Sequence, residues 1–160
     1  MSDTIYLSIG SNMGDRENYL NEAIVYLNDI DGVDVIDKSN IYETSPVGDV
    51  EQEDFLNIVV SANVSISPRD LLTSVWGIEK ILGRERTIKW GPRTIDIDIV
   101  LWGDKVITES DLVIPHKEMY NREFVLVPLR EIYKEKDGFK IDFEAILSKL
   151  DLGKVRRYYG

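Results

Sequence analysis

Hydrophobic residues in the first half of the chain follow a strand-like, then a helix-like, then again a strand-like spacing. Tyr6-Leu7-Ser8-Ile9 is a short, mostly apolar stretch that ends at Gly10, and it predicts a strand. Residues 33–44 carry scattered β-branched side chains and predict a second strand. Between them, Asp15 is a good N-cap for a helix whose hydrophobic residues recur every three or four positions: Leu20, Ala23, Ile24, Leu27 and Ile30.

Strict alternation marks the next stretch, residues 55–66. One face of this predicted strand holds Asn57, Ser61 and Asn63 together with Val59, and the other face is apolar, with Leu56, Ile58, Val60, Ala62, Val64 and Ile66. A second helix is then expected from Ser67 as N-cap and Pro68 as its first residue, to a C-terminal cap at Gly83.

The remaining sequence predicts one long strand and several shorter elements. Residues 94–102 alternate again, and Gly103-Asp104 turns the chain toward residues 105–107. Residues 139–150 are expected to add a strand fragment and a final helix.

The order strand, helix, strand, strand, helix, strand is that of the ferredoxin-like split motif. Its βαββαβ core is an α+β fold, in which an antiparallel sheet carries both helices on one face. No internal repeat, low-complexity tract or linker divides the sequence, so residues 1–160 are expected to form a single domain. A polar connection rich in Asp and Glu runs from Pro46 to Asp54, and loops of this length are often functional.

Composition restricts the functional classes. The chain of 160 residues is 43% hydrophobic and 30% charged, which is typical of globular proteins. Its net charge of −10 argues against a nucleic-acid partner, and the absence of cysteine excludes disulfides and thiolate chemistry. No apolar run reaches the roughly 18 residues of a membrane span, and residues 1–4 do not resemble a signal peptide, so a cytoplasmic location is expected. No obligatory protein partner is evident.

Basic residues concentrate in residues 83–93, against the acidic trend of the chain. Arg84, Arg86, Lys89 and Arg93 stand there with a single acidic residue. The cluster is compatible with a solvated charged loop. The alternative is a site for a small phosphate-bearing ligand, because a negative net charge does not prevent local positive charge from binding an anion.

Asp96 and Asp98 occupy alternate positions of the strand predicted after this loop. With a rise of about 3.3 Å per residue, their side chains point to the same face roughly 6–7 Å apart. Neighbouring carboxylates repel each other, and a pair of Mg²⁺ ions that also holds substrate phosphates relieves this repulsion. An ordinary polar strand face is the alternative. Arg93, three residues before Asp96, favours a phosphate site because phosphates need both cations and metal ions.

Further polar residues follow in two short segments. Ile114-Pro115-His116-Lys117 contains the only histidine, and Asn121-Arg122-Glu123-Phe124 adds a cation and an aromatic ring. A lone histidine is more often structural than catalytic, but these cations make His116 a candidate for a phosphate or nucleotide contact. The chain has no P-loop, dinucleotide fingerprint or protein-kinase signature, so phosphoryl chemistry would need metal ions and side-chain cations on a different fold.

Together these motifs resemble the 6-hydroxymethyl-7,8-dihydropterin pyrophosphokinase family over nearly the whole chain. The run Gly-Pro-Arg-x-Ile-Asp-x-Asp is highly specific to that family. The other matching motifs are Ile9-Gly10-Ser11-Asn12, Tyr42-Glu43-Thr44-Ser45-Pro46, Phe55-Leu56-Asn57, Gly83-Arg84, Pro115-His116 and Asn121-Arg122-Glu123-Phe124. The resemblance implies transfer of the diphosphate of ATP to hydroxymethyl-dihydropterin in folate synthesis, with AMP as the other product.

The resemblance also implies a role for each site residue. Asp96 and Asp98 would hold two Mg²⁺ ions, and Arg84 and Arg93 would act with them in catalysis. The pterin would lie between Phe55 and Phe124, and its remaining contacts would be Gly10, Thr44, Val47 and Asn57. The residues that would contact ATP are Arg84, Trp90, Arg93, Ile99, Leu112, His116, Lys117 and Arg122. Two positions depart from the family pattern, since Phe55 stands where many members have tyrosine and Lys117 where an aromatic is common.

Two other functions fit part of the pattern. A two-metal nucleotidyltransferase could use Asp96 and Asp98 to attach AMP to an acceptor, and it would release pyrophosphate. A ferredoxin-like binding or regulatory module fits the fold alone, but leaves the run from Arg93 to Asp98 unexplained. The nucleotide product distinguishes the three functions. Asp98 is also a candidate general base.

Overall fold

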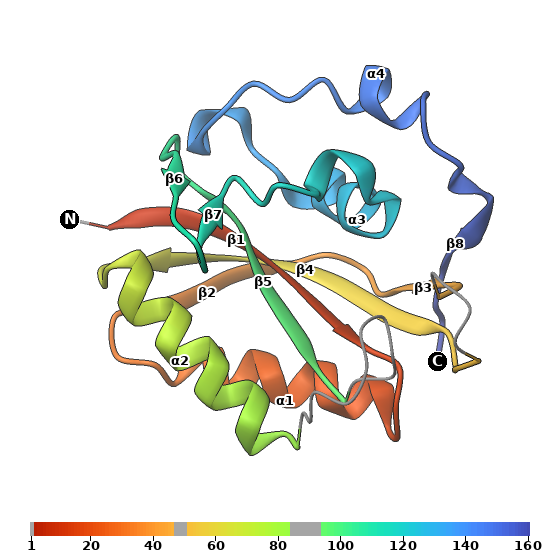
Figure 1. Cartoon of the computed structure of the whole chain (residues 1–160), viewed down its shortest axis with the longest axis horizontal. Coiled ribbons are helices and arrows are strands. Elements are labelled where there is room, and N and C mark those ends of the chain that lie inside the picture. The colour runs from red at the N-terminus through yellow and green to blue at the C-terminus, as the bar shows by residue number, and fades with distance from the viewer. Residues whose placement is uncertain (1, 47–50, 84–93) are drawn as a thin grey trace.

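The computed structural model describes residues 2–46, 51–83 and 94–160, and within these ranges its centre is a six-stranded sheet (Figure 1). The strands lie in the order β5-β1-β4-β3-β8, with β2 also paired to β4, and all these pairs are antiparallel. A separate hairpin consists of β6 (Ile107–Thr108) and β7 (Val113–Ile114). The strands of the sheet are β1 (Asp3–Ser11), β2 (Val33–Lys38), β3 (Tyr42–Thr44), β4 (Phe55–Val64), β5 (Asp96–Trp102) and β8 (Val155–Arg157).

Helices cover both faces of this sheet. α1 (Arg16–Asn28) and α2 (Pro68–Ile81) pack on one face, whereas α3 (Glu123–Ile132) and α4 (Phe143–Leu147) lie over the other (Figure 1). None of the helices in the described ranges is long and apolar enough to cross a membrane. Three short 3-10 helices are Met119–Asn121, Glu135–Asp137 and Leu152–Lys154.

The ends of α1 and α2 follow the predicted capping. The Asp15 side chain accepts a hydrogen bond from the Asn18 N–H, and the Ser67 side chain accepts one from the Asp70 N–H. Gly83 follows α2 with a φ of 85°, the left-handed conformation that glycine adopts easily at a helix C-terminus. These elements give the predicted ferredoxin-like βαββαβ core, with both of its helices on one face.

The sheet divides the core into two hydrophobic clusters. The cluster under α1 and α2 includes the predicted apolar face of β4. The cluster under α3 and α4 contains Val59 of β4, together with Tyr6, Leu101, Leu126 and Leu129. The middle of the sheet is therefore buried on both faces, and its polar side chains are left near its ends.

Residues 33–44 form two strands, not the single predicted strand. The register of β2 shifts between Val35 and Asp37, and the chain then leaves the sheet before β3 begins. At this break Ser39 replaces a strand pairing, because its side-chain oxygen accepts the Val59 N–H at 3.0 Å and its own N–H donates to the Val59 carbonyl at 2.9 Å. The scattered β-branched residues did not predict this break between the two strands.

The C-terminal part differs most from the prediction. The expected final helix is present as α4, but the strand fragment expected within residues 139–150 is wrong, and the last strand is β8, paired with β3. The helix α3 was not predicted. Its buried Val125, Leu126, Leu129 and Ile132 have helical spacing, but Pro128 within the same segment argues against a helix from sequence.

Candidate functional site

The candidate site lies at one end of the sheet, on the face that carries α3. Gly10 of β1 pairs with Asp96 of β5 on one side and with Asn57 of β4 on the other. Asp98 pairs with Ser8, two residues along β1. Because residues paired across antiparallel strands point to the same face, Asp96, Asp98 and Asn57 lie on one face of the sheet. The alternation predicted a shared face for the two aspartates.

Asp98 has two nitrogen-bearing side chains beside it, both from the chain that follows β7. The Nε2 atom of His116 lies 3.8 Å from its Oδ1 atom, and the Nη1 atom of Arg122 lies 3.7 Å from its Oδ2 atom. The Asp98 side chain is 31% exposed, so it remains accessible to a ligand. The structure thus places two predicted ATP contacts beside a predicted metal ligand.

The imidazole of His116 has a defined orientation. Its Nδ1 atom accepts the Glu118 N–H at 3.2 Å, so the neutral ring carries its proton on Nε2, which faces Asp98. The backbone N–H of His116 donates to the Val100 carbonyl of β5 at 2.9 Å, which fixes this segment to the strand. Burial, and secondly the nearby Arg122, lower the pKa of His116, while Asp96 opposes the shift. His116 is therefore suited to donate a neutral Nε2–H hydrogen bond.

The donor set of this site is compatible with Mg²⁺. Within residues 2–46, 51–83 and 94–160, no group of three or more His, Cys, Asp or Glu gathers as a complete metal cage. Two carboxylates on one strand face suit Mg²⁺, which is commonly held by one or two carboxylates together with substrate phosphates and water. Asp96 and Asp98 offer such a pair.

Glu79 of α2 supports the strand that carries both aspartates. Its side chain is buried, and its Oε2 atom accepts the Ile97 N–H at 2.9 Å. β5 is at the edge of the sheet, and Ile97 lies between the two aspartates, so Glu79 satisfies a strand N–H that points away from β1. Sequence reasoning missed Glu79. The available signal was a charged residue next to Ile78 and four residues after Val75, in the buried stripe of an amphipathic helix.

A cavity of about 410 Å³ runs along the edge of β5 beside this pair. It reaches from the aspartates to the segment after β6 and to Trp76 of α2, which sequence reasoning also missed. Four predicted ATP contacts line it together with both aspartates: Ile99, Leu112, His116 and Lys117. The structure therefore brings these four residues into one cavity next to the carboxylates.

The predicted pterin contacts lie on the other side of β1. Asn57 and Thr44 are buried, and the Asn57 Nδ2 atom is 3.5 Å from the Thr44 hydroxyl oxygen. A Cβ atom on Gly10 would approach the Asn57 Oδ1 atom to 2.7 Å and Phe55 to 3.6 Å. Only glycine therefore leaves room at this position for the Asn57 amide to lie across β1.

Phe124 enters the site from the start of α3. The guanidinium carbon of Arg122 lies 5.6 Å from the centre of its ring, which is a cation–π distance. Phe55 belongs to β4 and Phe124 to α3. That the two rings contact opposite faces of a pterin stays a prediction. Arg84, Trp90, Arg93 and Val47 lie outside the described residues.

The sequence also matches a protein-family model over most of its length. Residues 6–134 match the model of 7,8-dihydro-6-hydroxymethylpterin-pyrophosphokinase (HPPK). The chain belongs to this family. The match spans β1 through α3 and so includes every described residue of the candidate site, which confirms the resemblance found from the motifs.

Similar curated proteins include a pyrophosphokinase and a bifunctional protein. The chain is 42% identical over 156 residues to the 2-amino-4-hydroxy-6-hydroxymethyldihydropteridine pyrophosphokinase of Bacillus subtilis, with 98% of this chain and 90% of that protein covered. It is 49% identical over 147 residues to the bifunctional protein FolKE of Lactococcus lactis subsp. cremoris, with 92% of this chain covered. The match covers 42% of that protein, so the chain spans less than half of this bifunctional relative.

Solved structures of the family have the same fold. A Plasmodium falciparum HPPK-DHPS triple mutant with pteroate matches with a TM-score of 0.72 at 15% identity, covering 100% of this chain and 47% of that chain. A second Plasmodium falciparum HPPK-DHPS structure, with pterin and p-hydroxybenzoate, matches with a TM-score of 0.70 at 13% identity, covering 100% of this chain and 47% of that one. At such low identity the likeness concerns the fold, and it agrees with the predicted ferredoxin-like class.

Proposed function

We propose that the protein transfers the diphosphate of ATP to the hydroxymethyl group of 6-hydroxymethyl-7,8-dihydropterin, releasing AMP. Family membership supports this reaction, and one structural observation carries the assignment to particular residues. Asp96 and Asp98 stand between two different regions, the cavity lined by Leu112 and His116 and, across β1, the buried amide of Asn57. A donor nucleotide and a planar acceptor could thus meet at the carboxylates.

The nucleotide side of the site supplies positive charge and hydrogen bonds. Two Mg²⁺ ions bound to Asp96 and Asp98 would neutralise phosphate charge on both sides of the reacting phosphorus. Arg122 and the Nε2–H of His116 face Asp98 and would bind phosphate oxygens. Ile99 and Leu112, both nearly buried, give the cavity an apolar wall for a nucleobase. Diphosphoryl transfer needs such positioning and charge neutralisation more than covalent chemistry by the protein.

The pterin side supplies shape and a polar edge. A pterin ring is flat, with apolar faces and a hydrogen-bonding rim, and the amide of Asn57 offers both a donor and an acceptor to that rim. Because Asn57 is buried, a ring lacking matching groups would leave its amide without hydrogen bonds, which disfavours binding of that ring. Phe55 and Phe124 would contact the two faces of the ring.

The nucleotide product tests this proposal. The protein is incubated with ATP, Mg²⁺ and hydroxymethyl-dihydropterin, and the products are separated by chromatography. AMP and pterin diphosphate are expected, each dependent on Mg²⁺ and on the pterin. Release of inorganic pyrophosphate with AMP attached to the acceptor would indicate a nucleotidyltransferase, and lack of any turnover would contradict the proposed reaction.

A further inference from the structure

The chain segment that enters β4 is held by side chains from outside the sheet. Gln52, Glu53 and Asp54 precede Phe55 and lie outside the strands. The Asn12 Nδ2 atom donates to the Gln52 side chain at 2.7 Å and to the Glu53 carbonyl at 3.0 Å. Asn12 itself is buried at the end of β1, so it anchors this segment to the sheet.

Two arginines that are distant in sequence, Arg16 and Arg156, bind the next residue, Asp54. Arg16, the first residue of α1, donates from Nη1 to the Asp54 carbonyl at 2.8 Å and to the Glu43 carboxylate at 2.7 Å. Arg156 of β8 donates from Nη2 to the other oxygen of Glu43 at 3.0 Å and to the Asp54 carboxylate. Glu43, Asp54, Arg16 and Arg156 therefore form one connected cluster, called here the arginine clamp.

The arginine clamp lies on the face of β3 and β4 opposite the predicted pterin contacts. Glu43 pairs with Leu56, whose side chain faces α1 and α2. The next residue, Thr44, pairs with Phe55, and both are predicted pterin contacts. Each acid of the clamp thus immediately precedes a predicted pterin contact, Glu43 before Thr44 and Asp54 before Phe55. Holding the two acids together fixes the backbone on which these contacts stand.

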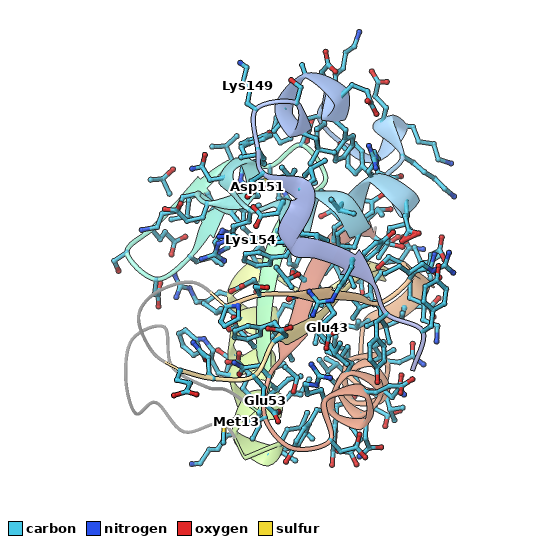
Figure 2. The ribbon with its side chains drawn as sticks, turned by 90° about the vertical axis from the view of Figure 1, so that its right-hand side faces the viewer. Met13, Glu43, Glu53, Lys149, Asp151 and Lys154 are labelled. Carbon is cyan, nitrogen blue, oxygen red and sulfur yellow. The ribbon has the colours of Figure 1, made fainter. Side chains whose placement is uncertain are left out.

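The C-terminal strand β8 is short, and Arg156 lies at its centre. β8 has three residues and pairs with β3, where Arg156 stands directly opposite Glu43. Figure 2 looks onto this strand, which passes in front after the labelled Asp151 and Lys154, with Glu43 beside it and Glu53 and Met13 farther along the same side. β8 therefore places a cation beside Glu43, which immediately precedes the predicted pterin contact Thr44.

We propose that Arg156, acting through Glu43 and Asp54, is a positioning residue for pterin binding. This inference rests on the proposed function, and it concerns affinity for the acceptor and not the chemical step. The Arg156 side chain is 49% exposed, and exposed ion pairs are individually weak, so we expect a loss of about 3- to 10-fold in pterin affinity when Arg156 is removed.

The matched control is Arg157, its neighbour on β8. Arg157 donates to Asn40 at 2.9 Å and lies 5.1 Å from the Tyr159 ring centre, outside the clamp. Binding of hydroxymethyl-dihydropterin is measured by fluorescence titration for the wild type, Arg156→Ala and Arg157→Ala, with Mg²⁺ and a non-hydrolysable ATP analogue present. Arg156→Ala should raise the Kd for the pterin, and Arg157→Ala should leave it unchanged. The KM for ATP and kcat at saturating pterin should stay near wild type in both.

A second variant tests the clamp without altering β8. Asp54→Asn removes the ion pair with Arg156 but keeps the Arg16 bond to the Asp54 carbonyl, so it should raise the pterin Kd in the same direction. The double variant Asp54→Asn/Arg156→Ala should bind pterin as weakly as Arg156→Ala alone, because the ion pair that Asp54→Asn removes is already absent in Arg156→Ala. The difference between wild type and Arg156→Ala should also shrink in 0.5 M salt, about the concentration at which exposed charges are screened within a few ångströms.

The outcomes separate the clamp from the proposed function. If the wild type binds no pterin, the proposed function fails. If the wild type binds pterin and both Arg156→Ala and Asp54→Asn match Arg157→Ala, the clamp proposal is wrong. If Arg156→Ala does not fold, as judged by circular dichroism, unchanged pterin affinity in Asp54→Asn is sufficient to overturn it.

Discussion

At the scale of single residues, Asp98 lies close to several other candidate site residues. It shares a strand face with Asp96 and lies near both His116 and Arg122. We predict that Asp98→Ala lowers kcat by at least about 100-fold, because one carboxylate of the proposed Mg²⁺ pair is lost. The fold should survive, since this side chain is outside both hydrophobic clusters. Circular dichroism and a Mg²⁺-dependent turnover assay measure both effects. A folded variant with near-normal turnover would show that Asp98 has no catalytic role.

Gly10 is a second residue that can be tested, because the space for a side chain there is limited by Asn57. Gly10→Ala would place a Cβ atom 2.7 Å from the Asn57 Oδ1 atom, so the amide must move. We predict a loss of about tenfold or more in pterin affinity, because Asn57 would no longer present its donor and acceptor together.

The control for this variant is Gly77→Ala in α2. Apart from its chain neighbours and the nearby backbone of α2 itself, no atom lies within 4 Å of the Cβ position of Gly77, and alanine favours a helix over glycine by about 1 kcal/mol. Gly77→Ala should thus be slightly stabilising with unchanged pterin binding. Wild-type pterin affinity in Gly10→Ala would show that the Asn57 amide is not a determinant of binding.

At the scale of elements, α2 packs against β5 and supports the strand that carries Asp96 and Asp98. We predict that Glu79→Leu destabilises the protein by about 1–3 kcal/mol, because the Ile97 N–H loses its acceptor in a buried position. Half-saturation of turnover by Mg²⁺ should also require a higher concentration, since the strand between the aspartates is less firmly held.

Glu79→Gln is the matched comparison for this prediction. It keeps a side-chain oxygen that can accept the Ile97 N–H, so it should keep most of the stability that Glu79→Leu loses. Urea unfolding and Mg²⁺ titration of activity measure the two effects. Equal stability of Glu79→Leu and wild type would mean that the hydrogen bond does not anchor β5.

The junction after α3 gives the protein a pH-dependent stability. Burial, and secondly the nearby Asp137, raise the pKa of Tyr133 from 10.0 to about 12. Between these pH values the folded state retains a proton that the unfolded chain has lost, so the free energy of unfolding should fall as pH rises from 10 to 12. Below pH 10 both states keep the proton, and this contribution is constant.

Tyr133→Phe isolates this effect. The variant loses the hydroxyl that donates to the Phe139 carbonyl, so it should be less stable at pH 8, but its stability should fall less steeply between pH 10 and 12. Urea unfolding at a series of pH values gives both quantities. An identical pH dependence in wild type and variant would assign the alkaline loss to other groups.

The elements also show which parts of the fold can be predicted from sequence. Local signals were sufficient for α1, α2, β4 and β5, where caps and alternation agree with the final packing. They were insufficient for α3, because its burial on the second sheet face outweighs the unfavourable Pro128. They were also insufficient for β8, whose pairing with β3 joins residues more than a hundred positions apart.

At the scale of the whole molecule, the sequence predicted which residues gather at the candidate site better than it predicted the residues that support them. Asp96, Asp98 and His116 were predicted from the residue types and spacing that metal and phosphate binding would require, and the structure places them side by side. Glu79 and Arg156 could not, since their roles depend on contacts with strands that are distant in sequence. The order of elements was sufficient for the ferredoxin-like class, but not for the burial of both faces of the sheet.

The central claim is that two phosphoryl groups move together from ATP to the pterin. ATP labelled at the β-phosphate and ATP labelled at the γ-phosphate are supplied in separate reactions with hydroxymethyl-dihydropterin and Mg²⁺. The account predicts that each label appears on the pterin in equal amount, with unlabelled AMP as the nucleotide product. Transfer of the γ-label alone, with release of β-labelled ADP, would contradict diphosphate transfer even if the pterin is the true acceptor.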